Sequence, residues 1–342
     1  MASQTIEHLI DIPALERFVN ENVPGTAGPI AVEKHIAGFS NETFYVTRGD
    51  DRWVMRRPPA GPLLPTAHDV LREHRFLAAL HGKARVPRPV AVCEDASVIG
   101  APFYLMERAE GTVIRDAIPA AYDSAEGRRH IGEEMIDALV EMHGVDWKAA
   151  GIKGHEGGYL SRQLERWSSQ WALTKPRTRE LAGLDALTDW LKAKIPEEGP
   201  SAVVHGDYKL DNVMFDRNDP RLIAIFDWEM ATVGDPLADL GYLMNSWAPA
   251  APPPGSPPPL VQRAGFPSVR EMADRYEARS GRSMRSFLFY RVLAQYKLIV
   301  ILEGLYMHYI EGAASNPGAK EFETRVPMMI ETAQRLIAAE DR

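Results

Sequence analysis

One stretch, residues 203–229, constrains this chain more than any other. A short apolar run leads into a His-Gly-Asp turn that ends at Asp207, and Asn212 follows five residues later, just before a second apolar run. A polar turn then separates that run from a third one, which is followed by Asp227. This alternation predicts a strand, a loop that carries Asp207, and a hairpin with a carboxylate at its exit.

Asp207, Asn212 and Asp227 are the residue types that phosphoryl transfer requires. An aspartate beside an acceptor hydroxyl orients it and takes its proton, while an amide oxygen and a second carboxylate hold Mg²⁺ on the phosphates of ATP. The ends of two antiparallel strands in a hairpin lie together, so Asp227 is expected beside Asn212. We therefore predict Asp207 as the catalytic residue and Asn212 and Asp227 as metal ligands. The structural alternative is a turn capped by His205 and Asp207.

This stretch resembles the aminoglycoside phosphotransferase and choline kinase branch of the protein-kinase-like superfamily. His205-Gly206-Asp207 stands where protein kinases have His-Arg-Asp, and Asp227 stands where they have the aspartate of Asp-Phe-Gly. The resemblance implies an α+β, two-lobed protein-kinase-like fold. Its small N-lobe holds an antiparallel sheet and one key helix, and its larger C-lobe is mainly helical.

Composition limits the class of protein. A length of 342 residues suits two lobes, and 45% hydrophobic residues are ample for a core. The net charge of -8 excludes a global attraction to nucleic acid. The single cysteine, Cys93, excludes a disulfide framework and suits a cytoplasmic protein. The N-terminus lacks the apolar segment of a signal peptide, and no apolar run is long enough to span a membrane.

The first third of the chain alternates short apolar runs with turns, which predicts a β-rich region. The expected elements are a helix at 12–20, strands at 30–36, 44–47 and 52–57, a helix at 68–80, and strands at 86–92 and 103–108. The resemblance makes this region, residues 1–110, the nucleotide-binding N-lobe.

Several residues of the N-lobe are expected to bind the nucleotide. A Gly-Phe-Ser-Asn loop follows the first strand, and its Ser40 and Asn41 offer donors to phosphate oxygens. Most kinases have a lysine on the third strand, but Arg56 stands here, which keeps the charge and adds a planar fork. In the family, a glutamate of the following helix pairs with that lysine, so the resemblance implies Glu73 as the partner of Arg56. Each of these features also has a structural alternative. The Gly-Phe-Ser-Asn loop can be an ordinary hairpin, Arg56 a solvated arginine, and Glu73 a surface glutamate.

The hinge between the lobes is expected near residues 107–111. The resemblance implies that backbone groups near Glu107 to Ala109, with Arg108 between them, meet the adenine edge of ATP. The lobe boundary is predicted near Gly111, so that residues 111–342 form the C-lobe with the catalytic loop, the metal site and the acceptor pocket.

Helical apolar spacing dominates the C-lobe. The clearest patterns predict helices at 131–143, 159–173, 286–310 and 325–339. Asp239, in a Gly-Asp-Pro-x-x-Asp-Leu run, is expected to bond the catalytic loop, and His143 is expected to be structural. The segment 248–259 is almost wholly Pro, Ala, Gly and Ser, which suits a surface loop or a lid over the acceptor.

A stripe of apolar residues in the helix 159–173 permits two interpretations. Leu160, Leu164, Trp167 and Trp171 recur at helical spacing. A tryptophan stripe of this period usually packs in a core. The alternative is a wall of the substrate site, with Arg162 and Arg166 as anion binders.

The acceptor is the least constrained part of the prediction. Residues 159–171, the Arg-Arg-Pro-Pro at 56–59 and the late Glu303-Gly304 are similar to the kinase-like domain fused ahead of certain acyl-CoA dehydrogenases, and to its free-standing bacterial relatives. This resemblance covers nearly the whole chain. It implies an ATP- and Mg²⁺-dependent small-molecule kinase whose acceptor is a hydroxyacyl-CoA. No nucleic acid or membrane partner is expected, and the oligomeric state stays open.

Three alternatives remain. An aminoglycoside-type O-phosphotransferase commonly needs an acidic pocket for its polycationic acceptor, and the C-terminal helices carry no acidic cluster. A non-catalytic nucleotide-binding pseudokinase is supported by Arg56 alone. A protein kinase is disfavoured because no Ala-Pro-Glu and no long activation segment follow Asp227.

Overall fold

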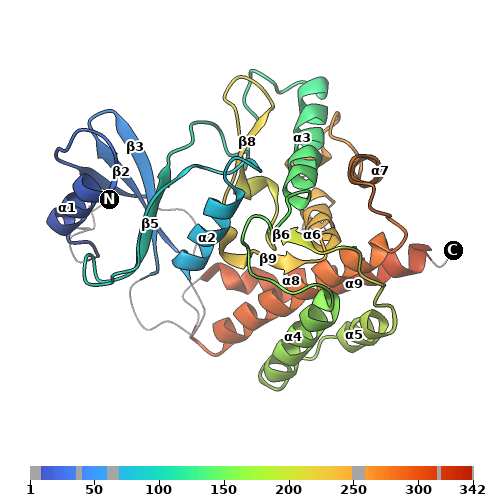
Figure 1. Ribbon diagram of the computed structural model, residues 1–342. Coiled ribbons are helices and arrows are strands. Elements are labelled where there is room, and N and C mark those ends of the chain that lie inside the picture. Colours follow the sequence, from blue (N-terminus) through green and yellow to red (C-terminus); the bar gives the residue numbers. More distant parts are fainter. Residues whose placement is uncertain (1–8, 36–40, 60–68, 249–258, 314–316, 341–342) are drawn as a thin grey trace.

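The computed structural model describes residues 9–35, 41–59, 69–248, 259–313 and 317–340. The chain forms two lobes: a five-stranded antiparallel sheet with α1 and α2 at the N-terminal end, and a larger C-lobe made mostly of helices (Figure 1). This is the α+β, two-lobed arrangement expected from the sequence.

The N-lobe sheet has the strand order β1-β2-β3-β5-β4. The strands are β1 (Ala31–His35), β2 (Glu42–Arg48), β3 (Asp51–Arg57), β4 (Pro89–Cys93) and β5 (Phe103–Glu107). Alternate apolar residues of β2, β3 and β5 point to one face, where they form a separate core with α1 (Ile12–Asn22). Phe18 of α1 meets Phe103 of β5 edge to face, with ring centroids 5.0 Å apart. The period-2 pattern thus fixes which face of the sheet α1 covers.

Helix α2 (Val70–Leu80) lies between the lobes. Its buried Phe76, Leu77 and Leu80 belong to the apolar core of the C-lobe and not to the core beneath the sheet. Arg72, in its first turn, donates hydrogen bonds to backbone carbonyls of Glu229 and Ala231 in the C-lobe. The position of α2 is therefore set by both lobes, which matters for the glutamate that it carries.

Seven α-helices lie in the described part of the C-lobe. They are α3 (Ala125–His143), α4 (Tyr159–Thr174), α5 (Leu184–Ala193), α6 (Leu237–Trp247), α7 (Val269–Ser280), α8 (Phe287–Ile310) and α9 (Phe322–Glu340). Helix α8 packs against α4, α5, α6 and α9, which explains why it is apolar on nearly every side.

The predicted helix boundaries were wrong where polar residues open a helix. Helix α3 begins at Ala125, six residues before the predicted start, because Ser124 caps an exposed first turn that carries no apolar pattern. Helices α5 and α7 were not predicted. Ser268 and Glu271 form a reciprocal capping box at the start of α7.

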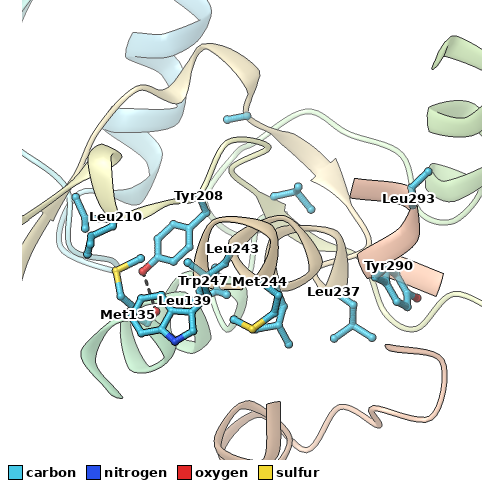
Figure 2. Close-up of a cluster of buried hydrophobic side chains, with 14 of the residues drawn as sticks. Met135, Leu139, Tyr208, Leu210, Leu237, Leu243, Met244, Trp247, Tyr290 and Leu293 are labelled. Carbon is cyan, nitrogen blue, oxygen red and sulfur yellow. Dashed lines mark hydrogen bonds between the residues drawn. The ribbon is translucent and has the colours of Figure 1, made fainter. Parts of the chain in front are cut away.

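Two two-stranded sheets carry the catalytic stretch, and one of them is a hairpin. Strand β6 (Ala202–Val204) pairs with β9 (Thr232–Gly234), and β7 (Val213–Phe215) pairs with β8 (Leu222–Ile225). Between β6 and β7, Tyr208 and Leu210 turn into a buried apolar cluster with Met135 and Leu139 of α3 (Figure 2). The Tyr208 hydroxyl donates to the Met135 carbonyl at 2.8 Å. The loop is thus anchored to the core on either side of its polar residues.

Some expectations fall outside the described residues. Nearly all of the Pro-rich segment 248–259 does, and so does Ser40. In the described part of the chain, every helix is too short or too polar to cross a bilayer.

Candidate active site

The His-Gly-Asp turn is held by a carboxylate from α6. The backbone N–H groups of His205 and Gly206 donate to the two oxygens of Asp239 at 2.6 and 2.7 Å. Gly206 has φ +83°, and a Cβ there would lie 2.8 Å from the Met230 carbonyl oxygen, so glycine is required. Asp239 therefore bonds the catalytic loop, as the sequence predicted.

The His205 ring joins the turn to the strand end before Asp227. Its Nε2 lies 2.7 Å from the Phe226 carbonyl oxygen, and its Nδ1 accepts from the Asp207 N–H at 3.2 Å. His143 is structural, since it is buried between Asp239 and Tyr276.

Asp207 is surrounded by hydrogen-bond donors. Its Oδ2 accepts from Asn212 Nδ2 at 2.8 Å and lies 3.0 Å from Lys209 Nζ, and the Tyr242 hydroxyl also bonds to it. Burial alone would raise the pKa of Asp207, but the Lys209 ammonium and the Tyr242 hydrogen bond outweigh it, so the pKa is lowered. The carboxylate is therefore ionised at neutral pH.

The β7–β8 hairpin brings Asp227 back beside Asn212. Val213 pairs with Ile225, and the Phe226 N–H donates to the Asn212 carbonyl at 2.8 Å. Asp227 has φ +66°, the only positive φ at a non-glycine position in the described residues. Aspartate is among the few residues that tolerate this conformation, which turns its side chain toward the cleft between the lobes.

Arg56 of β3 bridges two carboxylates from different lobes. Its Nη2 lies 3.3 Å from Glu73 Oε1 and 3.2 Å from Asp227 Oδ1, and its Nη1 donates to Thr43 Oγ1 at 3.3 Å. Burial would lower the pKa of Arg56, but Glu73, then Tyr104 and Asp227, raise it above its ordinary value. The predicted Arg56–Glu73 pair is present, and the contact with Asp227 was not predicted.

Glu73 is 2% exposed and collects several donors. Besides Arg56, it accepts from Asn41 Nδ2 at 3.3 Å and from the Tyr104 hydroxyl. The Asn41 amide is therefore directed at Glu73, although the sequence suggested that it faces phosphate oxygens. In this arrangement Asn41 helps to hold the carboxylate that holds Arg56.

A cleft of about 690 Å³ lies between the lobes. Its walls combine residues of the sheet, the hinge and the catalytic stretch: His35, Thr43, Tyr45, Val54, Arg56, Glu73, Met106, Arg108, Ala109, Glu110, Gly111, Val113, Arg115, Lys209, Asp211, Asn212, Met214, Arg217, Phe226 and Asp227. This volume is typical of sites that enclose a small-molecule ligand.

Part of the hinge backbone is already hydrogen-bonded within the N-lobe. The N–H groups of Glu107 and Arg108 already donate to the carbonyls of Arg88 and Arg52, at 2.8 and 3.2 Å. The Glu107 side chain is exposed and pairs with Arg88. The strand ladder thus takes these two N–H groups, and the contact of other backbone groups at 107–109 with an adenine stays a prediction. Arg108 does line the cleft, with its guanidinium 3.8 Å from the centre of the Tyr45 ring.

A second, smaller pocket of about 30 Å³ lies on the other side of the catalytic turn. It is lined by Tyr159, Gln163 and Trp167 of α4, Gly206, Ala238, Asp239 and Tyr242 of α6, and Tyr290, Leu293, Ala294 and Lys297 of α8. Trp167, from the tryptophan stripe of α4, packs in the core and also lines this pocket. Arg162 and Arg166 do not line this pocket.

Three residues at the site were missed by the sequence analysis. Lys209 lies within the catalytic motif, two residues after Asp207, and its position alone was a usable signal. Tyr242 and Lys297 come from α6 and α8, and no local pattern marks them. The one sequence signal for Lys297 is that it is a lone lysine in the apolar run of α8.

Comparisons with known proteins point to one family. Residues 32–280 match the family described as "Phosphotransferase enzyme family". The Acyl-CoA dehydrogenase family member 11 of Rattus norvegicus is 31% identical over 96% of this chain, which spans 44% of that protein's length. A crystal structure from Ralstonia eutropha JMP134, provisionally assigned as an aminoglycoside phosphotransferase, is 36% identical, with a TM-score of 0.82 over 95% of this chain and 99% of that one.

A third comparison concerns the fold alone. A thermostable aminoglycoside phosphotransferase in ternary complex with AMP-PNP and hygromycin B has a TM-score of 0.60 and 16% identity, over 94% of this chain and 98% of that one.

Proposed function

Because the chain belongs to the phosphotransferase enzyme family, and is thus a small-molecule phosphotransferase that acts on hydroxyl groups, we propose that it transfers the γ-phosphate of ATP to a hydroxyacyl-CoA. The observation that carries the proposal is the meeting of Asp207, Asn212 and Asp227. Asn212 bonds Asp207 at 2.8 Å through its side chain, and its carbonyl accepts from the residue before Asp227.

The cleft between the lobes is the proposed ATP site. The related fold that binds AMP-PNP supports a nucleotide here. The adenine edge would meet the segment 109–111, because the N–H groups before it are already bonded. The phosphates would lie toward Arg56 and Lys209, whose charges face the same cleft. We place the lobe boundary near Gly111, since Thr112 and Phe215 exchange backbone hydrogen bonds at 2.8 and 2.9 Å and join the hinge to β7.

The donor set at this site fits Mg²⁺. Asn212 and Asp227 supply an amide oxygen and a carboxylate, the hard oxygen donors that this ion prefers. No group of three His, Cys, Asp or Glu residues in the described parts of the chain could hold a metal by itself. That agrees with an ion that takes its remaining ligands from phosphates and water. When bound, Mg²⁺ would offset negative charge on the phosphates.

Asp207 is the proposed general base. The acceptor oxygen attacks the γ-phosphorus, the bond to the ADP oxygen breaks, and the hydroxyl proton passes to the Asp207 carboxylate. The bonds from Asn212 and Lys209 fix that carboxylate before the acceptor arrives, so little reorganisation remains. When ATP binds, Arg56 would leave Asp227 and pair with the α- and β-phosphates, whose negative charge it would balance.

The proposed acceptor rests on sequence similarity to relatives over nearly the whole chain. Identity of 31% over 96% of the chain with an acyl-CoA dehydrogenase family member supports a hydroxyacyl-CoA. An aminoglycoside acceptor is favoured by the provisional assignment of the 36% identical Ralstonia protein. Both acceptors offer a hydroxyl, so the chemical step is the same. Arg56 is the only feature that suggests a non-catalytic module, and its pairing with Glu73 keeps a cation at the usual position.

The experiment offers ATP with 4-hydroxyacyl-CoAs and, separately, with kanamycin-type aminoglycosides, and measures ADP release and the phosphorylated product. We expect turnover on the thioesters and none on the amines. Turnover on the amines alone would refute the acyl-CoA acceptor. Mg·ATP binding without turnover on any hydroxyl would refute the catalytic proposal itself. The Asp207→Asn variant is the matched control for contaminating kinases.

A further inference from the structure

Lys297 stands out in the small pocket. It is the only charged residue in the segment 292–302 of α8, and it reaches the catalytic turn. Its Nζ donates to the Gly206 carbonyl at 2.6 Å and lies 4.7 Å from the centre of the Tyr242 ring and 5.9 Å from that of Trp167. An ammonium has three N–H donors. In the described structure Gly206 accepts one of them, so two remain for a ligand.

The pocket has room for a small polar group. Its volume of about 30 Å³ matches one water molecule or a carbonyl group. It borders Gly206, the residue before the proposed base. A group bound there would belong to the acceptor and lie a few bonds from the reacting hydroxyl.

The pocket already holds one cation, Lys297, which disfavours a second cation on the acceptor. Arg166 and Lys209 both act on Lys297 as like charges. Asp239, the carboxylate in the pocket wall, already accepts from the His205 and Gly206 N–H groups and from His143. No lining carboxylate is therefore left to receive an ammonium group. Burial lowers the pKa of Lys297, whereas Asp207 and Asp239 raise it.

We propose that Lys297 determines acceptor specificity by donating hydrogen bonds to a carbonyl or carboxylate oxygen of the acceptor, a few bonds from the hydroxyl that is phosphorylated. This inference rests on the proposed function, which supplies the reacting hydroxyl. To that function it adds the chemical class of the acceptor group that lies near the reacting hydroxyl. A thioester carbonyl and a free carboxylate offer the same oxygen chemistry, and a polycationic acceptor offers neither.

The test compares three acceptors of equal chain length: a 4-hydroxyacyl-CoA, the free 4-hydroxy acid and the corresponding 1,4-diol. For the wild-type protein, kcat/KM should be about 10- to 100-fold higher for an acceptor with the oxygen than for the diol, the value of a hydrogen bond to a charged group. Preference for the thioester or for the acid identifies the source of the oxygen. Equal kcat/KM for all three would overturn the inference without any variant.

The variant Lys297→Met keeps the length of the side chain and removes its donors. We expect kcat/KM for the oxygen-bearing acceptors to fall about 10- to 100-fold and that for the diol to fall less than about threefold. The KM for ATP should stay unchanged. Lys192→Met, on the exposed face of α5, is the matched control. An equal loss on all three acceptors would mean that Lys297 only supports the turn through Gly206.

Failure of the proposed function gives a different result. If the wild-type protein phosphorylates none of these hydroxyl compounds, the function is wrong and the inference falls with it. If it phosphorylates them but the losses in Lys297→Met do not depend on the acceptor oxygen, only the inference is wrong.

Discussion

The two hollows on either side of the catalytic turn differ in size, chemistry and origin. The cleft between the lobes measures about 690 Å³ and is lined by several cations and carboxylates. The small pocket beside Gly206 measures about 30 Å³ and has four aromatic residues among its eleven lining residues, with Lys297 as its one cation. A large charged cleft suits a triphosphate, and a small pocket with one donor suits a single group of an acceptor. We thus propose that phosphoryl transfer takes place in the cleft and that the small pocket selects the acceptor.

The difference has a structural origin. The cleft takes Lys209, Asn212 and Asp227 from a single short stretch around one hairpin. The pocket takes its walls from α4, α6 and α8, which are far apart in the sequence. Residues in one hairpin keep their geometry together, whereas residues on three helices can change one at a time. Variants of cleft residues should therefore affect every acceptor alike, and variants of pocket residues should not.

The largest effect is expected from Asp227→Asn. Asparagine tolerates a positive φ as well as aspartate does, so the hairpin should keep its shape. Loss of the carboxylate removes a metal ligand and should lower kcat by roughly 10³-fold or more, given several kcal/mol of charge stabilisation. Steady-state kinetics with two chemically different acceptors measures this. A loss confined to one acceptor would break the division between cleft and pocket.

Asp207→Asn should come next. Replacing the base should lower kcat by roughly 10²- to 10⁴-fold. The affinity for Mg·ATP should change little, because Asp207 does not line the cleft. Single-turnover rates and equilibrium nucleotide binding separate the two effects. Full ATP-dependent turnover by this variant would show that another group takes the proton.

A smaller effect is expected from Arg56→Met. Loss of the cation should raise the KM for ATP by about 10- to 100-fold, the value of charge-assisted hydrogen bonds. It also leaves the buried Glu73 without its ion-pair partner, which should lower the free energy of unfolding by about 3–5 kcal/mol. Thermal or urea unfolding reports that cost, and the effect on KM should be the same for every acceptor. Arg56→Lys, which restores the charge, should recover most of the nucleotide affinity.

The sequence predicted the residues of the cleft better than those of the small pocket. Asp207, Asn212 and Asp227 lie within one motif, and the pairing of β7 with β8 brings them together as expected from antiparallel strands. The Arg56–Glu73 pair, which is present, was predicted from the resemblance to the kinase family. Tyr242 and Lys297 could not be found, because only the packing of α6 and α8 brings them to the turn. The pairing of the Glu107 and Arg108 N–H groups within the N-lobe also could not be found from the residue pattern, because strand register is not visible in it.

The smallest effect is expected where the two regions meet, at Tyr242. This residue lines the small pocket, and its hydroxyl bonds to Asp207 in the catalytic turn. Tyr242→Phe removes that bond, so the pKa of Asp207 should rise, although the ammonium of Lys209 still opposes the effect of burial. A base works only when ionised, so activity falls as the pH drops through its pKa. The acid limb of the kcat/KM profile should therefore move to higher pH in the variant.

At neutral pH the loss in kcat/KM should stay below about fivefold, since one neutral hydrogen bond is worth about 1 kcal/mol. The matched control is Tyr290→Phe, which also lines the pocket but bonds Asp235 instead of the base. Its acid limb should stay where the wild-type limb lies. If both variants shift the limb equally, the shift reports a general change in the pocket and Tyr242 does not tune the base. If only Tyr242→Phe shifts it, one side chain of the acceptor pocket sets the protonation of the catalytic carboxylate.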